Sequence, residues 1–115
     1  MSTEKKKRVY SHYTKDAALL LGKDIELARK ARKLTAHDFA DRVGISRITL
    51  KKIERGDLKC ELGLVLEAAA LAGVKLFDVD PHGQTFARSL ERVSDKLALL
   101  PKSVRARRKE VDDEF

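Results

Sequence analysis

The spacing of apolar residues predicts that the chain is built from helices. Between Thr14 and Leu34 the apolar residues recur at intervals of three or four, which is typical of an amphipathic helix. Thr14 can cap this helix, so we expect it to begin at Thr14 or Lys15. Its apolar stripe, expected in the core, consists of Leu20, Leu21, Ile25, Leu27, Ala28 and Ala31.

Two short helices are predicted next from their capping residues. Thr35 followed by Asp38 is a capping-box pattern, and the helix that it opens ends at Gly44. Ser46 can cap a third helix over residues 47–55. The side chains expected to face the core from these two helices are Phe39, Ala40, Val43, Leu50 and Ile53.

The second half of the chain continues the helical pattern. Residues 62–72 are apolar on nearly every side, which predicts a centrally placed helix. Residues 74–79 fit either a last helical turn or a short strand that pairs across a dimer, and the Asp-Pro-His-Gly sequence at 80–83 breaks the structure. An amphipathic helix is predicted over residues 85–100, with an apolar stripe of Phe86, Leu90, Val93, Leu97 and Leu100.

The fold class that follows is all-α. We expect a basic flexible arm at residues 1–13, a five-helix domain at 14–80, an amphipathic helix at 81–101 and a charged tail at 102–115. Aromatic residues make up only 5% of the chain and Trp is absent, so the core has to be built from aliphatic side chains. That composition favours packed helices over a sandwich or a barrel.

The charge of the chain indicates an anionic partner. A net charge of +7 and an isoelectric point near 9.7 are typical of proteins that bind nucleic acid or anionic lipid. The longest apolar stretch, residues 62–74, contains Glu67 and is too short to cross a bilayer. The N-terminus lacks the apolar region of a secretory signal. We therefore expect a cytoplasmic protein that binds an anionic partner and has no membrane contact.

The residue types used in catalysis and metal binding lack a suitable spacing. Cys60 is the single cysteine, which excludes an internal disulfide and a zinc finger with several Cys ligands. We interpret it as a small buried side chain and not as a nucleophile. His12, His37 and His82 lie in the arm, near a helix start and in the breaker. We expect no cofactor, no metal and no enzymatic activity.

The most informative pattern lies between Ala40 and Leu50. Two helices that cross steeply at a tight turn need a small residue at their contact, here Ala40, and a residue that adopts positive φ cheaply, here Gly44. They also need an apolar side chain that enters the gap, here Leu50, and a polar N-cap for the second helix, here Ser46. Because all four occur in register, we predict a helix-turn-helix.

This region resembles the helix-turn-helix family of phage repressors and XRE-type bacterial regulators. The resemblance covers residues 27–77 and rests on the run Leu34-Thr35, Phe39-Ala40, Val43-Gly44-Ile45-Ser46, Leu50 and Ile53-Glu54-Arg55-Gly56. It implies binding to double-stranded operator DNA, with the start of the third helix contacting bases. It also implies a bacterial protein that is held at the nucleoid by DNA. The base-reading positions carried over are Ser46, Arg47, Ile48, Lys51 and Lys52. The positions expected at phosphates are Thr35, Ala36, Thr49 and Arg55.

The same resemblance implies a structural ion pair and contains one departure. It pairs Arg29 on the first helix with Glu54 late in the third. Ala36 stands where the family often has a Gln that contacts phosphate, so only backbone N–H groups remain there to hold one. Arg47 is expected to contribute most to specificity, because its guanidinium can bind guanine O6 and N7 together. Ile48 would contact a thymine methyl group.

A narrower resemblance covers the arrangement of the whole chain. Residues 53–63, the segment 74–77 and the ending at 100–115 are similar to HipB-type antitoxins. This implies a homodimer that represses its own operon and binds a HipA-like serine/threonine kinase toxin. The amphipathic stripe at 86–100 would then face that partner. The alternatives are a protein-binding adaptor that has lost base reading and a regulator without a toxin.

Overall fold

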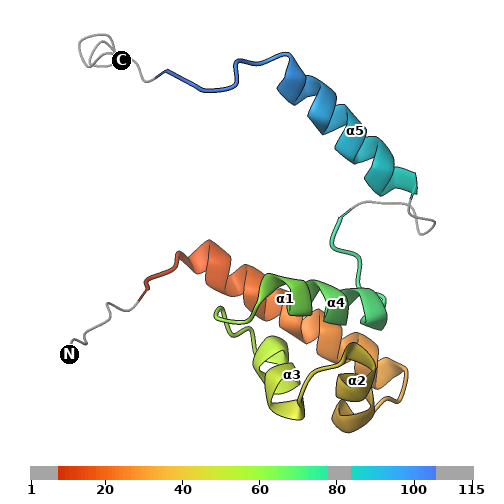
Figure 1. Ribbon diagram of the computed structural model, residues 1–115. Coiled ribbons are helices and arrows are strands. Elements are labelled where there is room, and N and C mark those ends of the chain that lie inside the picture. Colours follow the sequence, from red (N-terminus) through yellow and green to blue (C-terminus); the bar gives the residue numbers. More distant parts are fainter. Residues whose placement is uncertain (1–7, 78–83, 106–115) are drawn as a thin grey trace. The chain divides into compact units, whose positions relative to one another are not determined.

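The computed structural model describes residues 8–77 and 84–105, and within these ranges the chain is all-α, without a strand (Figure 1). The helices are α1 (His12–Ala31), α2 (Ala36–Val43), α3 (Arg47–Glu54), α4 (Leu62–Ala72) and α5 (Gln84–Ala98). The predicted fold class is confirmed. The chain divides between Leu76 and Phe77 into two units, so α1 to α4 are described separately from α5.

Both ends of α1 lie closer to the N-terminus than predicted. Ser11, and not Thr14, caps the helix: the Ser11 Oγ accepts a hydrogen bond from the Thr14 backbone N at 3.2 Å. The helix ends at Ala31 and not at Leu34, because Lys33 takes a left-handed conformation with a φ of 61°. The Leu34 N–H then donates to the Arg29 carbonyl at 3.1 Å, which closes the helix in a Schellman-type motif.

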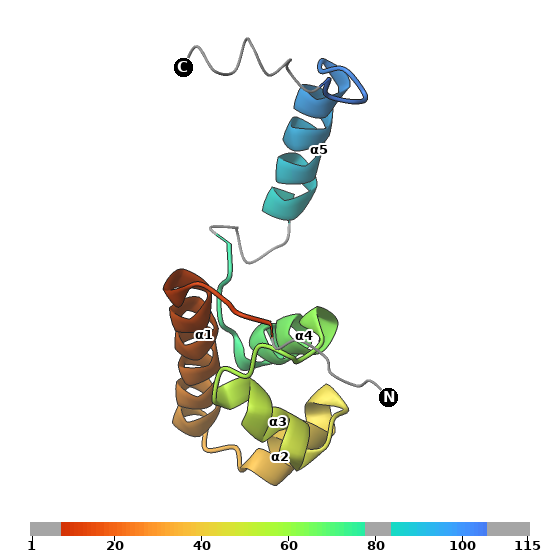
Figure 2. The ribbon, with the colours of Figure 1, turned by 90° about the vertical axis from the view of Figure 1, so that its left-hand side faces the viewer.

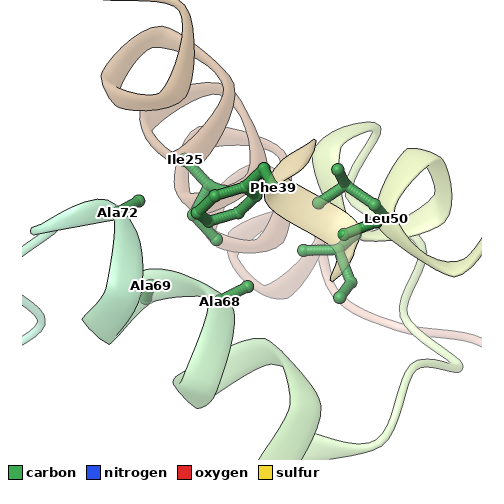
Figure 3. Close-up of a cluster of buried hydrophobic side chains, with 8 residues drawn as sticks. Ile25, Phe39, Leu50, Ala68, Ala69 and Ala72 are labelled. Carbon is green, nitrogen blue, oxygen red and sulfur yellow. The ribbon is translucent and has the colours of Figure 1, made fainter. Parts of the chain in front are cut away.

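The core of the first unit lies between α1, α2, α3 and α4. α1 and α2 each pack against both α3 and α4, and Figure 2 shows α2 and α3 next to each other. The largest fully buried side chains are Ile25, Phe39 and Leu50. Figure 3 shows these side chains together with the small ones that α4 contributes, which are Ala68, Ala69 and Ala72. Alanines at the contact let the backbone of α4 come close to its neighbours.

Gly22 lets α1 and α3 approach closely. It is buried in α1, and a Cβ placed on it would lie 2.4 Å from the carbonyl oxygen of Ile53 and 2.7 Å from that of Glu54. Those oxygens belong to the backbone of α3 and cannot rotate away as a side chain could. Gly22 therefore sets the distance at which α3 is held against α1.

The apolar stripe predicted for α1 is distributed over two faces. Ile25 is fully buried, and Leu21 and Ala28 pack against the core beside it. The other half of the stripe lies on the opposite, exposed face of the helix. Its members are Leu20, which is 63% exposed, Leu27, which is 69% exposed, and Ala31. The expectation that these three residues lie in the core is wrong, because the helix buries only the side that faces α3 and α4.

The central position predicted for α4 is also wrong. Its buried face consists of alanines, whereas Leu62 is 71% exposed and Leu66 is 38% exposed within this unit. An uninterrupted apolar sequence cannot indicate which side of a helix is covered. At its C-terminal end α4 is held by Arg32, the residue after α1, whose Nη1 donates to the Leu71 carbonyl at 3.1 Å.

The segment after α4 does not complete a five-helix domain. Val74–Phe77, the described part of residues 74–79, forms neither a helical turn nor a strand. The breaker at 80–83 lies outside the described residues. The first unit thus contains four helices. In the second unit α5 occupies residues 84–98, against a prediction of 85–100, and the Phe77 and Phe86 rings pack edge to face with centroids 5.7 Å apart.

Candidate DNA interface

The turn between α2 and α3 has the geometry that a helix-turn-helix requires. Gly44 adopts a left-handed conformation with a φ of 88° and a ψ of 32°. The N–H groups of Gly44 and Ile45 both donate to the Ala40 carbonyl, at 2.8 and 3.0 Å, and so close the end of α2. A Cβ on Gly44 would meet nothing within 4 Å, so the backbone conformation, and not the available space, favours glycine here.

The two helices are fixed against each other by small and apolar side chains. Ala40 of α2 is 1% exposed and Leu50 of α3 is fully buried, and both belong to the core cluster. Ile53 lies in the same cluster one turn further along α3. Because α3 buries Leu50 and Ile53, its opposite side is turned away from the core.

A buried ion pair joins α3 to α1. The Arg29 Nε donates to Glu54 Oε2 at 2.8 Å and the Nη2 donates to Oε1 at 3.0 Å. The remaining nitrogen, Nη1, donates to the Leu34 carbonyl at 2.9 Å, so the guanidinium also supports the start of the α1–α2 turn. The hydrogen bonds to Glu54 raise the pKa of Arg29 above its ordinary value. Both side chains are less than 10% exposed, so the pair is shielded from solvent and holds α3 against α1.

The outward side of α3 is basic and carries one apolar residue. Ile48 is 69% exposed, and the cationic side chains around it are all exposed. These cations are Arg47, Lys51, Lys52 and Arg55. The single acidic residue of α3 is Glu54, which is buried against Arg29. The ion pair therefore removes a negative charge that would otherwise weaken binding of a polyanion.

The comparisons with known proteins agree with this geometry. Residues 25–78 match a protein family described as helix-turn-helix. The matched residues cover a little under half of the chain and include the C-terminal part of α1 together with α2, α3 and α4. Helix-turn-helix domains bind DNA in transcriptional regulators, and the match supports a DNA-binding domain of this kind at residues 25–78. No curated protein and no solved structure matches the chain.

The helix-turn-helix leaves free backbone donors at the start of α3. The Ser46 Oγ accepts a hydrogen bond from the Thr49 N at 3.0 Å and donates to the Thr49 Oγ1 at 3.1 Å. These bonds use the Ser46 proton and one of its lone pairs, which leaves one lone pair for another donor. The N–H groups of Arg47 and Ile48, in the first turn, have no partner within a helix and point along its positive end.

The start of α2 offers a second set of donors. The Thr35 Oγ1 accepts from the Asp38 N at 3.0 Å, which leaves its own O–H to donate elsewhere. The Ala36 side chain packs against the core, so at this position only the backbone N–H can contact a phosphate. His37 is exposed and its Nε2 lies 3.5 Å from an oxygen of Asp41 on the next turn.

Three structural residues of the domain went unrecognised in the sequence. Gly22 sets the spacing of α1 and α3, Lys33 ends α1, and Arg32 holds the end of α4. A glycine in the middle of a helical pattern is a signal of close packing, so Gly22 could have been found. Lys33 and Arg32 carry no such signal, since a left-handed Lys and a capping Arg look like any other surface cation.

The structure also describes Cys60 and the last part of the basic arm. Burial raises the pKa of the Cys60 thiol, and Asp57 raises it further, so the thiol is a poor nucleophile. A cavity of about 310 Å³ beside it is lined mainly by apolar residues from α1, from the segment between α3 and α4, and from the start of α4. Of the arm, residues 1–7 lie outside the described residues, and the Arg8 guanidinium lies 5.5 Å from the centre of the Tyr10 ring. Over the described ranges no helix is long and apolar enough to cross a membrane, and no cluster of metal-ligating side chains is found.

Proposed function

We propose that this chain is a sequence-specific, dimeric transcriptional repressor that reads operator DNA with α3. The observation that carries the proposal is the exposed basic side of α3, with Ile48 among four cations and the acidic Glu54 buried behind it. The exposed basic side of a helix can enter the major groove, where its cations contact phosphates and base edges. One such helix reads few base pairs, so two copies on half-sites about 34 Å apart are needed for specificity.

Each side chain has a separate role in this proposal. Arg47 binds a guanine through two hydrogen bonds, and Ile48 contacts a thymine methyl group. Ser46 offers its remaining lone pair to a base amino group, and Lys51 and Lys52 reach base edges or phosphates. Phosphates bind at the start of α2, through Thr35 and the N–H of Ala36, and at Thr49 and Arg55.

The test is selection of binding sites from a random duplex library, followed by affinity measurements on the selected site. Arg47→Ala should weaken binding about 10- to 100-fold and relax the preference at one base pair, since a bidentate contact is worth about 1–3 kcal/mol. Lys75→Ala removes the same charge from an exposed position outside α3 and should lower affinity equally on all sequences. Equal weakening on all sequences by Arg47→Ala would contradict base reading. A wild-type protein that binds every duplex alike would support the adaptor alternative.

We further propose that the repressor is the antitoxin of a HipA-like serine/threonine kinase. Support comes from the similarity of residues 53–63, 74–77 and 100–115 to HipB-type antitoxins. It also comes from α5, whose apolar residues Phe86, Leu90 and Leu97 are 46%, 66% and 62% exposed. A kinase-like reading frame beside the gene is expected, and its product should co-purify with the wild-type protein. Leu90→Asp should abolish co-purification and leave operator binding intact. The absence of such a reading frame would contradict the antitoxin role.

A further inference from the structure

The exposed side of α1 carries a second apolar stripe with coiled-coil spacing. Its large members, Tyr13, Leu20 and Leu27, are 82%, 63% and 69% exposed. Between and after them lie Ala17, Asp24 and Ala31, which are exposed as well. Together the six residues alternate steps of four and three along the helix, which is the spacing of a two-helix seam. We call this set of six residues the α1 seam.

The α1 seam lies away from the reading surface. α3 contacts α1 at Gly22, and Gly22, Ile25 and Arg29 occupy the buried side of the helix, opposite to the seam. A partner on the seam would therefore leave α3 free to meet DNA. Four of the six seam residues precede residue 25, where the match to the helix-turn-helix family begins. Most of the seam therefore lies outside the matched residues.

We propose that the α1 seam binds the seam of a second copy of this chain, with the two α1 helices antiparallel. This proposal rests on the dimeric repressor proposed above and names the surface through which the dimer forms. In the register with the greatest overlap, Tyr13 faces Ala31 of the second copy and Ala17 faces Leu27 of the second copy. Leu20 faces Asp24 of the second copy.

The sizes of the side chains favour this arrangement. In the antiparallel register a large side chain meets a small one at both ends of the seam, which lets the layers interdigitate. In a parallel pair each residue would face its own counterpart. Tyr13 would then meet Tyr13 and Ala17 would meet Ala17, which gives crowding in one layer and a gap in the next.

The charges beside the seam favour it as well. Asp16, Lys23 and Lys30 flank the seam on one side, at intervals of one heptad. In the antiparallel pair Asp16 lies beside Lys30 of the second copy at each end. Lys30 already contacts Glu26 of its own helix, with Nζ and Oε2 2.8 Å apart, and would be shared between the two carboxylates.

The centre of the seam is also balanced in charge. Lys23 lies beside Lys23 of the second copy at the two-fold axis, and the two Asp24 carboxylates next to them along the helices offset the charge of these cations. In a parallel pair Asp24 would face Asp24 at an apolar position. Like charges in that geometry repel, so a parallel pair is disfavoured.

The pairing is expected to be reversible in the free protein. Stable interfaces bury about 1,200 Å² or more, and three large side chains from each copy fall short of that area. Adjacent operator half-sites raise the local concentration of the second copy and so favour the pair on DNA. Self-association of the free protein should therefore require micromolar or higher concentration.

Disulfide cross-linking tests both the surface and the direction of the helices. In a Cys60→Ser background, Ala17→Cys and Leu27→Cys proteins are oxidised separately and as an equal mixture, without DNA. Only the mixture should cross-link efficiently, because positions 17 and 27 face each other. Two copies of position 17 would be about 15 Å apart at 1.5 Å per residue, which is too far for a disulfide. Efficient cross-linking of the Ala17→Cys protein alone would establish a parallel pair and overturn the proposal, and so would a mixture that reacts no faster than its components.

Sedimentation of point variants gives a second, independent measurement. Leu20→Asp should weaken self-association at least tenfold, whereas Leu62→Asp, at an equally exposed leucine of α4, should leave it unchanged. Binding of Leu20→Asp to a single half-site should equal that of the wild type. If Leu20→Asp lowered the thermal stability but left self-association unchanged, another part of the same chain would cover the seam, and the proposal would be overturned. Wild-type protein that cross-links but selects no DNA site would refute the repressor and leave the seam intact.

Discussion

Replacing Gly22 with alanine tests how closely α3 is held against α1. The added Cβ would lie 2.4 Å from the Ile53 carbonyl oxygen and 2.7 Å from that of Glu54. Ordinary contacts begin near 3.4 Å, so the two helices would have to separate by up to about 1 Å. Overpacking of this kind costs about 1–3 kcal/mol, and the upper part of the range applies because the obstructing atoms are backbone.

Two effects of opposite sign therefore compete in Gly22→Ala. Alanine is better than glycine in a helix by about 1 kcal/mol. After this gain is subtracted, we expect a net loss of about 1–2 kcal/mol in the free energy of unfolding. That loss corresponds to a decrease of about 5–15 °C in Tm for a domain of this size. Operator binding should also weaken, because α3 moves relative to α2.

Gly63→Ala is the matched control. Gly63 also lies in a helix, but a Cβ on it would meet nothing within 4 Å. This variant should gain about 0.5–1 kcal/mol from helix propensity alone. Both variants are compared with the wild type by urea and thermal unfolding, followed by circular dichroism at 222 nm. If Gly22→Ala were as stable as the wild type, the close approach of α1 and α3 would not constrain the packing of the domain.

Three further predictions concern single residues. Lys33→Gly should raise the free energy of unfolding in urea by about 1 kcal/mol, because glycine adopts the left-handed conformation without strain. Lys33→Ala keeps the strain, so an equal gain from Lys33→Ala would refute this explanation. Glu54→Ala should cost about 3 kcal/mol because it leaves Arg29 buried without its carboxylate, and the double variant with Arg29→Met should recover part of that loss. Burial raises the pKa of Cys60, so less thiolate is present at pH 8. Iodoacetamide should therefore react more slowly with the folded protein than with protein in 8 M urea. A faster reaction in the folded state would contradict the raised pKa of this thiol.

The sequence predicted the helix-turn-helix closely because its signals are local. Thr35 and Ser46 cap their helices in the structure as predicted, and Gly44 takes the positive φ expected of it. α2 and α4 have the predicted bounds, and α3 ends one residue earlier than predicted. Caps and turns depend on residues within three or four positions of each other, so their geometry is encoded in short stretches of sequence.

The faces of α1 and α4 could not be predicted in the same way. Both helices have apolar residues on more than one side, and periodicity alone does not say which side meets the core. The buried side of α1 contains Gly22 and Arg29, which do not look like core residues. They are buried because α3 approaches at Gly22 and because Glu54 supplies the charge that Arg29 needs.

The amino-acid sequence alone thus determined where α2, α3 and α4 lie and which residues project from the start of α3. The packing of α1 against α3 and α4 decided which leucines are buried and which remain on the surface. The physical reason is that a hydrogen-bonded cap involves neighbours in the chain, whereas burial depends on residues brought together from distant parts of it. The α1 seam became visible only once the tertiary structure had assigned the other side of α1 to the core.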